Sequence, residues 1–122
     1  MTRNREAILE VIRESPGPVS AAEVWDRLRA RGSRIGIATV YRILKGETEA
    51  GTLEHSEFPG GQSRYETAGR DHHHHFLCTN CDRAFEVSGC VDGIQAIVPP
   101  RFALAGHAIM LFGECLDCQE VG

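Results

Sequence analysis

Two pairs of closely spaced cysteines constrain this chain more than any other feature of its sequence. Cys78 and Cys81 form one CxxC unit, and Cys115 and Cys118 form a second. Four thiolates can converge on one zinc ion at about 2.3 Å, and each CxxC turn presents two of them. The chain begins without an apolar signal segment and holds an odd number of cysteines, five, so a disulfide framework is the weaker interpretation. The spacing predicts a closed structural zinc site.

The composition is that of an ordinary globular protein, with 42% hydrophobic and 25% charged residues among 122. No apolar run approaches the roughly 20 residues that span a bilayer, so we expect a cytoplasmic protein without a membrane partner. Residues 1–66 carry ten basic and ten acidic side chains, whereas residues 67–122 carry three and seven. The basic side chains of the first half could form a nucleic-acid-binding face, which composition permits but does not show.

The first 67 residues predict a winged helix, which is three short helices followed by a β-hairpin. Apolar side chains recur at helical spacing in residues 3–14 and 37–50, and a capping box at Ser20–Glu23 begins a helix between them. Residues 52–58 and 63–67 are expected strands on either side of a Pro-Gly-Gly turn.

The second half predicts a small α/β domain. Expected strands at 75–77 and 84–87 flank the first CxxC, and a short helical patch at 91–97 and a buried strand at 108–112 precede the second. So small a core needs help, which zinc and dimerisation would supply. The predicted fold class is therefore α+β, with a winged-helix domain at 1–67, a linker at 68–71 and a metal-binding dimerisation domain at 72–122.

Four consecutive histidines, His72 to His75, directly precede the first CxxC. In an extended chain His73 and His75 would face one side and His72 and His74 the other, so the run could serve two metal sites. Imidazole and carboxylate ligands suit zinc, iron(II), manganese and nickel alike. The alternatives are a solvated surface run, a small buried cysteine at Cys90 and a histidine with an ordinary structural role at His107. The candidate partners of the run are Glu54, His55, Glu66, Glu86, Cys90 and His107.

Taken together, these motifs resemble the ferric uptake regulator family of metal-dependent repressors over nearly the whole chain. Residues 35–42 (IGIATVYR) resemble the family's recognition helix, and residues 60–66 (GGQSRYE) resemble its wing. The histidine run, His107 and the two CxxC units follow in the family's order. The resemblance implies a homodimer that binds double-stranded DNA operators, with Thr39, Tyr41 and Arg42 at the DNA face.

The resemblance also implies two kinds of metal site. A structural zinc would be held by Cys78, Cys81, Cys115 and Cys118. A regulatory ion between the domains would set the spacing of the two winged helices on DNA. The ligands implied for that ion are His73, His75, Glu66 and Glu86.

The chain also departs from the family pattern at several positions. Pro18 stands where iron- and peroxide-sensing members usually have a histidine ligand. The family's additional site would use His72, His74, His107 and an acid, but Gly93 occupies the acid's position. Cys90 and Glu54 are the alternative ligands that the sequence offers.

We therefore expect a metal-responsive repressor that senses zinc, because the chain has four adjacent histidines, a spare Cys90 and no histidine at 18. The alternatives are an iron(II)-, manganese- or peroxide-responsive regulator of the same family. A zinc metalloenzyme or a metal-storage module is a more distant alternative. An enzyme is disfavoured because there is no HExxH motif, no evident pocket for a small organic substrate, and a closed cysteine site.

Overall fold

The structure, a computed structural model, describes residues 2–69 and 72–121. The chain divides into two compact units, Met1–Arg70 and Asp71–Gly122, here called the N-terminal and C-terminal units. Two residues of the predicted linker, 70 and 71, lie outside the described residues. Within the described ranges, no helix has both the length and the apolar character needed to cross a membrane.

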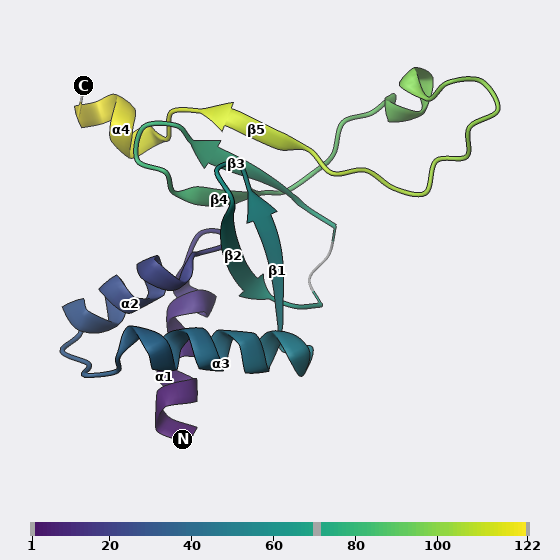
Figure 1. Ribbon diagram of the computed structural model, residues 1–122. Coiled ribbons are helices and arrows are strands. Elements are labelled where there is room, and N and C mark those ends of the chain that lie inside the picture. Colours follow the sequence, from purple (N-terminus) through teal and green to yellow (C-terminus); the bar gives the residue numbers. More distant parts are fainter. Residues whose placement is uncertain (1, 70–71, 122) are drawn as a thin grey trace. The chain divides into compact units, whose positions relative to one another are not determined.

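The N-terminal unit consists of three helices and a two-stranded hairpin (Figure 1). The helices are α1 (Thr2–Glu14), α2 (Ala21–Ala30) and α3 (Ile37–Glu49), and the hairpin strands are β1 (Leu53–Phe58) and β2 (Gln62–Thr67). The strands are antiparallel, with Leu53 opposite Thr67 and Phe58 opposite Gln62. Apolar side chains of all three helices form one core, and several of them are completely buried: Ile8, Val11, Val24, Val40 and Leu44.

The start of α2 is held by the predicted capping box. The Glu23 backbone N–H donates to Ser20 Oγ at 3.2 Å, and the Ser20 N–H donates to Glu23 Oε1 at 2.9 Å. The same Glu23 oxygen accepts a hydrogen bond of 2.7 Å from Arg64 on β2, whose side chain is only 1% exposed. A buried arginine thus joins the hairpin to α2, a link that the sequence did not predict.

The C-terminal unit is a three-stranded sheet followed by a short helix. Its strands are β3 (His74–Cys78), β4 (Ala84–Val87) and β5 (Met110–Gly113), in the order β4-β3-β5. Strand β4 runs antiparallel to β3, and β5 runs parallel to it. The helix α4 (Leu116–Val121) was not predicted. These elements, together with the N-terminal winged helix, confirm the predicted α+β class.

Two details of the C-terminal prediction were wrong. The helical patch expected at 91–97 is only a 3-10 turn, η1 (Ile94–Ile97), because Gly93 enters it in the left-handed region at φ 85° and Pro99 follows it closely. The strand expected to be buried begins at Met110, and Leu111 and Phe112 are 43% and 56% exposed. Since no long helix forms between β4 and β5, these side chains remain uncovered within the chain.

Candidate metal centres and DNA-facing surface

The four paired cysteines lie together in the C-terminal unit. Cys78 ends β3 and Cys81 follows in the turn. Cys115 directly precedes α4, and Cys118 lies within that helix. Four sulfurs placed tetrahedrally at 2.3 Å from zinc would be about 3.8 Å apart. The Sγ atoms of Cys78 and Cys118 are 3.6 Å apart, and those of Cys81 and Cys115 are 3.8 Å apart. The cluster therefore fits a structural zinc ion.

Hydrogen bonds differentiate these four thiols. The backbone N–H groups of Cys81 and Cys115 donate to Cys78 Sγ at 3.4 and 3.3 Å, and they lower the pKa of Cys78 to about 6. The hydrogen bond from Asn80 lowers the pKa of Cys118, but burial and the neighbouring thiols outweigh it and raise the value to about 12. One thiol of the cluster is thus ready to bind a metal ion as a thiolate near neutral pH.

Arg83 is a partner of this cluster that sequence reasoning missed. Its guanidinium donates to Cys81 Sγ at 3.3 Å, to Cys115 Sγ at 3.4 Å and to the Asp117 carboxylate at 3.0 Å. The bond from Arg83 is the main reason why the pKa of Cys81 is lowered. The sequence signal for this role was a cation two residues after a CxxC unit. Four thiolates around a divalent ion carry a net negative charge, which a neighbouring cation offsets.

A second cluster of ligands combines three histidines with the unpaired cysteine. We call it the His/Cys tetrad, and its members are His72, His74, Cys90 and His107. Tetrahedral zinc would hold two nitrogens about 3.3 Å apart and a nitrogen and a sulfur about 3.5 Å apart. The tetrad has 3.1 Å between His72 and His74 Nε2, and 3.4, 3.8 and 2.8 Å between Cys90 Sγ and the Nε2 atoms of His74, His72 and His107.

The tetrad changes the interpretation of the family's additional site. Gly93 removes the acid expected there, and Cys90, three residues earlier in the sequence, lies beside the three imidazoles instead. His74 is the buried member, at 4% exposure, and burial followed by the neighbouring imidazoles lowers its pKa, which keeps the ring neutral. The tetrad offers three imidazole nitrogens and one sulfur, a set suited to zinc.

A hydrogen bond to His74 links the tetrad to Ile109, the residue before β5. The Ile109 N–H donates to His74 Nδ1 at 3.2 Å, so the proton of the neutral ring sits on Nε2, facing Cys90. A metal bound at Nε2 would replace that proton, and Nδ1 would then carry it. The Ile109 hydrogen bond would therefore be exchanged for a metal–ligand bond.

His73 and His75 form a separate pair, with ring centroids 5.0 Å apart. Glu86 on β4 is paired in register with His75, and its Oε1 lies 3.6 Å from His73 Nδ1. Two further predicted ligands belong to the N-terminal unit. Glu66 on β2 is buried, at 9% exposure, whereas Glu54 on β1 is exposed and accepts a long hydrogen bond of 3.5 Å from the Gly69 N–H.

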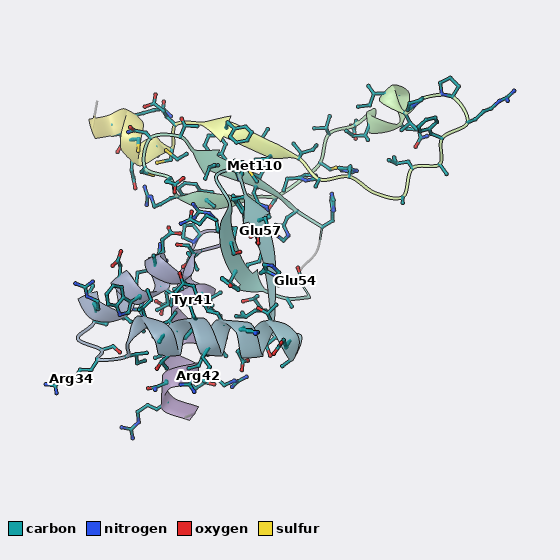
Figure 2. All side chains as sticks on the ribbon, in the orientation of Figure 1. Arg34, Tyr41, Arg42, Glu54, Glu57 and Met110 are labelled. Carbon is teal, nitrogen blue, oxygen red and sulfur yellow. The ribbon has the colours of Figure 1, made fainter. Side chains whose placement is uncertain are left out.

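The predicted DNA-contacting residues lie on α3. Tyr41 is 55% exposed, Arg42 is exposed and Thr39 is half-buried. Figure 2 shows Arg42 on this helix and Arg34 on the loop that precedes it, so the arginine before the helix adds a cation that the prediction omitted. Between α3 and the hairpin runs an open groove lined by Tyr41, Lys45, Thr48, Glu49, His55, Ser63 and Tyr65.

These features define a class, the winged-helix transcription regulators that carry metal-binding sites. The sequence profile of the Ferric uptake regulator family matches residues 1–112, and the chain belongs to that family. Its members are DNA-binding, metal-responsive regulators that typically dimerise, and they are not enzymes.

Individual relatives agree with this assignment. The Ferric uptake regulation protein of Bordetella parapertussis is 39% identical over 120 residues, which are 95% of this chain and 86% of the relative. The ferric uptake regulator of Vibrio cholerae is similar in structure, with a TM-score of 0.72, 33% identity and coverage of 91% of this chain and 88% of that one. FurB from M. tuberculosis, a zinc uptake regulator, has a TM-score of 0.55, 34% identity and coverage of 96% and 93%.

Proposed function

We propose that this chain is a zinc-responsive repressor that acts as a homodimer in the cytoplasm. The observation that carries the choice of zinc is the Cys90 sulfur among three imidazoles in the tetrad. A thiolate is a soft ligand that favours zinc over manganese and iron(II). Protein sites in general also bind zinc more tightly than they bind manganese or iron(II). The likeness to relatives does not decide the metal, since those named above regulate the uptake of iron or of zinc.

The regulatory site that we propose lies on the other face of the histidine run. His73, His75 and Glu86 would supply ligands from the C-terminal unit, and Glu66 would supply one from the N-terminal unit. The 3.6 Å approach of Glu86 to His73 supports this set. A divalent ion bound by both units would hold the winged helices of a dimer at the spacing of two DNA half-sites.

The proposed DNA contacts are made by α3. Tyr41 would contact thymine methyl groups or base edges in the major groove, and Arg42 would contact phosphates or bases, with Thr39 beside them. The proposed dimer is supported by large apolar side chains left exposed in the C-terminal unit. Those exposed by more than half are Val91, Ile97, Phe102, Phe112 and Leu116.

The second candidate is an iron(II)- or manganese-responsive regulator. It is favoured by the ligand set of the proposed regulatory site, which combines two imidazoles with carboxylates and has no sulfur. Imidazole and carboxylate ligands suit iron(II) and manganese as well as zinc. In that case the tetrad would hold a zinc ion that does not control DNA binding.

The test combines metal analysis with DNA-binding titrations of the whole chain. We expect one zinc per chain to resist mild chelation and the more labile ions, at the tetrad and the regulatory site, to switch DNA binding, with zinc more effective than iron(II) or manganese. Tyr41→Ala and Arg42→Ala should weaken DNA binding and leave the metal content unchanged. Arg13→Ala is the matched control, because it removes an exposed arginine from α1, which carries none of the proposed DNA contacts. DNA binding that ignores the labile ions would refute the switch, and a stronger response to iron(II) or manganese would refute zinc sensing.

A further inference from the structure

The ten basic side chains of residues 1–66 divide into two groups according to their partners. Six are bonded to other side chains of the N-terminal unit, five of them to acidic residues and Arg27 to the Ser15 hydroxyl: Arg5, Arg13, Arg27, Arg29, Arg31 and Arg64. The other four have neither an ion pair nor a side-chain hydrogen bond with any residue that the structure describes: Arg3, Arg34, Arg42 and Lys45. The positive charge that this unit can offer to a partner is therefore concentrated in these four side chains.

The four free cations lie on α3 and beside it. Arg42 and Lys45 are exposed on the helix itself, and Arg34 is exposed on the loop that precedes it. Arg3 is exposed in the first turn of α1. Figure 2 shows Arg34 and Arg42 on the side of this unit that faces away from the hairpin, and the N-terminal end of α1 lies on that side as well (Figure 1). The positive surface thus extends beyond the proposed recognition helix.

Two of these cations line one open notch between the start of α1 and the loop before α3. We call it the arginine notch, and its lining consists of Arg3, Asn4, Ala7, Ser33, Arg34 and Ile35. None of the six residues is acidic, so the two guanidinium groups are not neutralised within the notch. Guanidinium groups match the geometry of phosphate oxygens and are weakly hydrated, which makes phosphate the anion that such a notch fits.

The loop that carries Arg34 is fixed on both sides of this residue. The Ser33 N–H donates to the Leu28 carbonyl at 3.0 Å, and the Ile35 N–H donates to Ser33 Oγ at 3.2 Å. The Ile35 carbonyl in turn accepts a hydrogen bond of 3.2 Å from Trp25 Nε1. Because the Ser33 hydroxyl is an acceptor in its bond, its own proton can be donated to an anion in the notch. Binding would therefore order little more than the arginine side chains themselves.

We propose that the arginine notch holds the backbone of double-stranded DNA, with Arg3 and Arg34 each neutralising one phosphate. The inference rests on the proposed function in that α3 enters the major groove, since the notch would then meet the strand that borders this groove. Contacts to phosphates supply affinity and fix the register of the protein without reading the sequence. The notch contains no candidate metal ligand, so this contact should operate with or without the regulatory ion.

The salt dependence of DNA binding tests the inference. The full chain, carrying its structural zinc but not the labile ions, would be titrated with a random-sequence duplex at salt concentrations from about 20 to about 80 mM. Each phosphate contact contributes about 0.9 to the slope of log K against log salt. Replacing both Arg3 and Arg34 by glutamine should make this slope shallower by about 1.8 for each N-terminal unit that contacts the duplex. The loss of affinity over the fourfold rise in salt should then be about twelvefold smaller.

Matched variants separate this contact from a general loss of charge. Arg13→Gln and Arg29→Gln remove the same charge from arginines that are already paired with acids, so the slope should not change. Lysine at both positions, Arg3→Lys with Arg34→Lys, should restore most of the slope, because an ammonium group also neutralises a phosphate. Thermal unfolding followed by the fluorescence of Trp25 should be the same in all these variants, because the replaced side chains are exposed.

The possible outcomes distinguish this inference from the proposed function. If the slope is unchanged by the double glutamine variant, or is changed equally by Arg13→Gln, the arginine notch does not bind DNA. A slope that still becomes shallower in Arg42→Gln would show that DNA binding by α3 survives that result. If the unchanged chain binds no duplex even at the lowest salt, both the inference and the proposed function are overturned.

Discussion

Arg64 should be the residue on which the attachment of the wing to the helices most depends. Its guanidinium is 1% exposed, donates to Glu23 Oε1 at 2.7 Å and to Gln62 Oε1 at 2.9 Å, and lies 5.1 Å from the centre of the Phe58 ring. Arg64→Met would keep an apolar stem of similar length against Phe58 but remove the charge and its hydrogen bonds. The hairpin would then lose its ionic link to α2.

The expected cost follows from the burial of the pair. Removing one partner of a buried ion pair costs about 3–5 kcal/mol. Glu23 is 26% exposed and keeps its hydrogen bond from the Ser20 N–H, so its carboxylate is not stranded and the lower end applies, about 3 kcal/mol. For a unit of roughly 70 residues, that loss corresponds to a fall in Tm of roughly 12–24 °C.

The only tryptophan in the chain makes the assay specific to this unit. Trp25 lies on α2 and donates from Nε1 to the Ile35 carbonyl at 3.2 Å, so its fluorescence reports unfolding of the helices. Glu23→Gln is the matched second variant, because glutamine can still complete the capping box. A double-mutant cycle should give a coupling energy of about 1.5–3 kcal/mol. Additive effects of the two substitutions, or a loss below about 1 kcal/mol for Arg64→Met, would refute the reasoning.

Two further predictions concern the four-cysteine cluster. Arg83→Ala should raise the pKa of Cys81 and lower zinc affinity by about tenfold, measured by competition with a chelator. Arg83 is 35% exposed, so we expect the low end of the usual loss of roughly 10–100-fold that follows removal of a residue contacting metal ligands. An unchanged zinc affinity would contradict the role given to Arg83. In the reduced, metal-free chain, thiolate absorbance should show one ionisation near pH 6 that Cys78→Ser removes. A lowered pKa stabilises the folded state fully above the ordinary value of 9.0, and this contribution is lost as pH falls through about 6. The raised pKa of Cys118 changes the stability of the folded state only above pH 9.0. The metal-free C-terminal unit should therefore resist urea better at about pH 8 than at about pH 5. The opposite order would contradict the assignment of the low pKa to Cys78.

The parts of the fold that could be predicted from sequence are those that local patterns determine. Helical periodicity, the Ser20 capping box and a Pro-Gly-Gly turn each depend on a few neighbouring residues, and together they predicted the winged helix. The same holds within each CxxC unit, where one turn brings two sulfurs together. The position of Arg64 could not be predicted in this way, because an arginine in a strand normally points to solvent. Its burial depends on Glu23, which lies 41 residues earlier in the chain.

The sequence offered Cys90 only as one of several candidate ligands, for a related reason. Cys90 and His107 are separated by a segment without a long helix, so no periodicity predicts that its two ends meet. The exposure of Leu111 and Phe112 has the same origin, because the short helical patch expected at 91–97 is reduced to a single 3-10 turn.

β3 and the two residues before it connect the ligand sets of the C-terminal unit. His72 and His74 contribute to the tetrad, His73 and His75 form the other pair, and Cys78 at the end of β3 belongs to the four-cysteine cluster. Because side chains alternate along a strand, a shift of β3 by one residue would exchange the two histidine pairs. The four-cysteine cluster opposes such a shift, since the N–H groups of both Cys81 and Cys115 bind the Cys78 sulfur. The structural zinc would thus fix the register in which each histidine meets its own partners, and its loss should impair both other sites even though none of their ligands is changed.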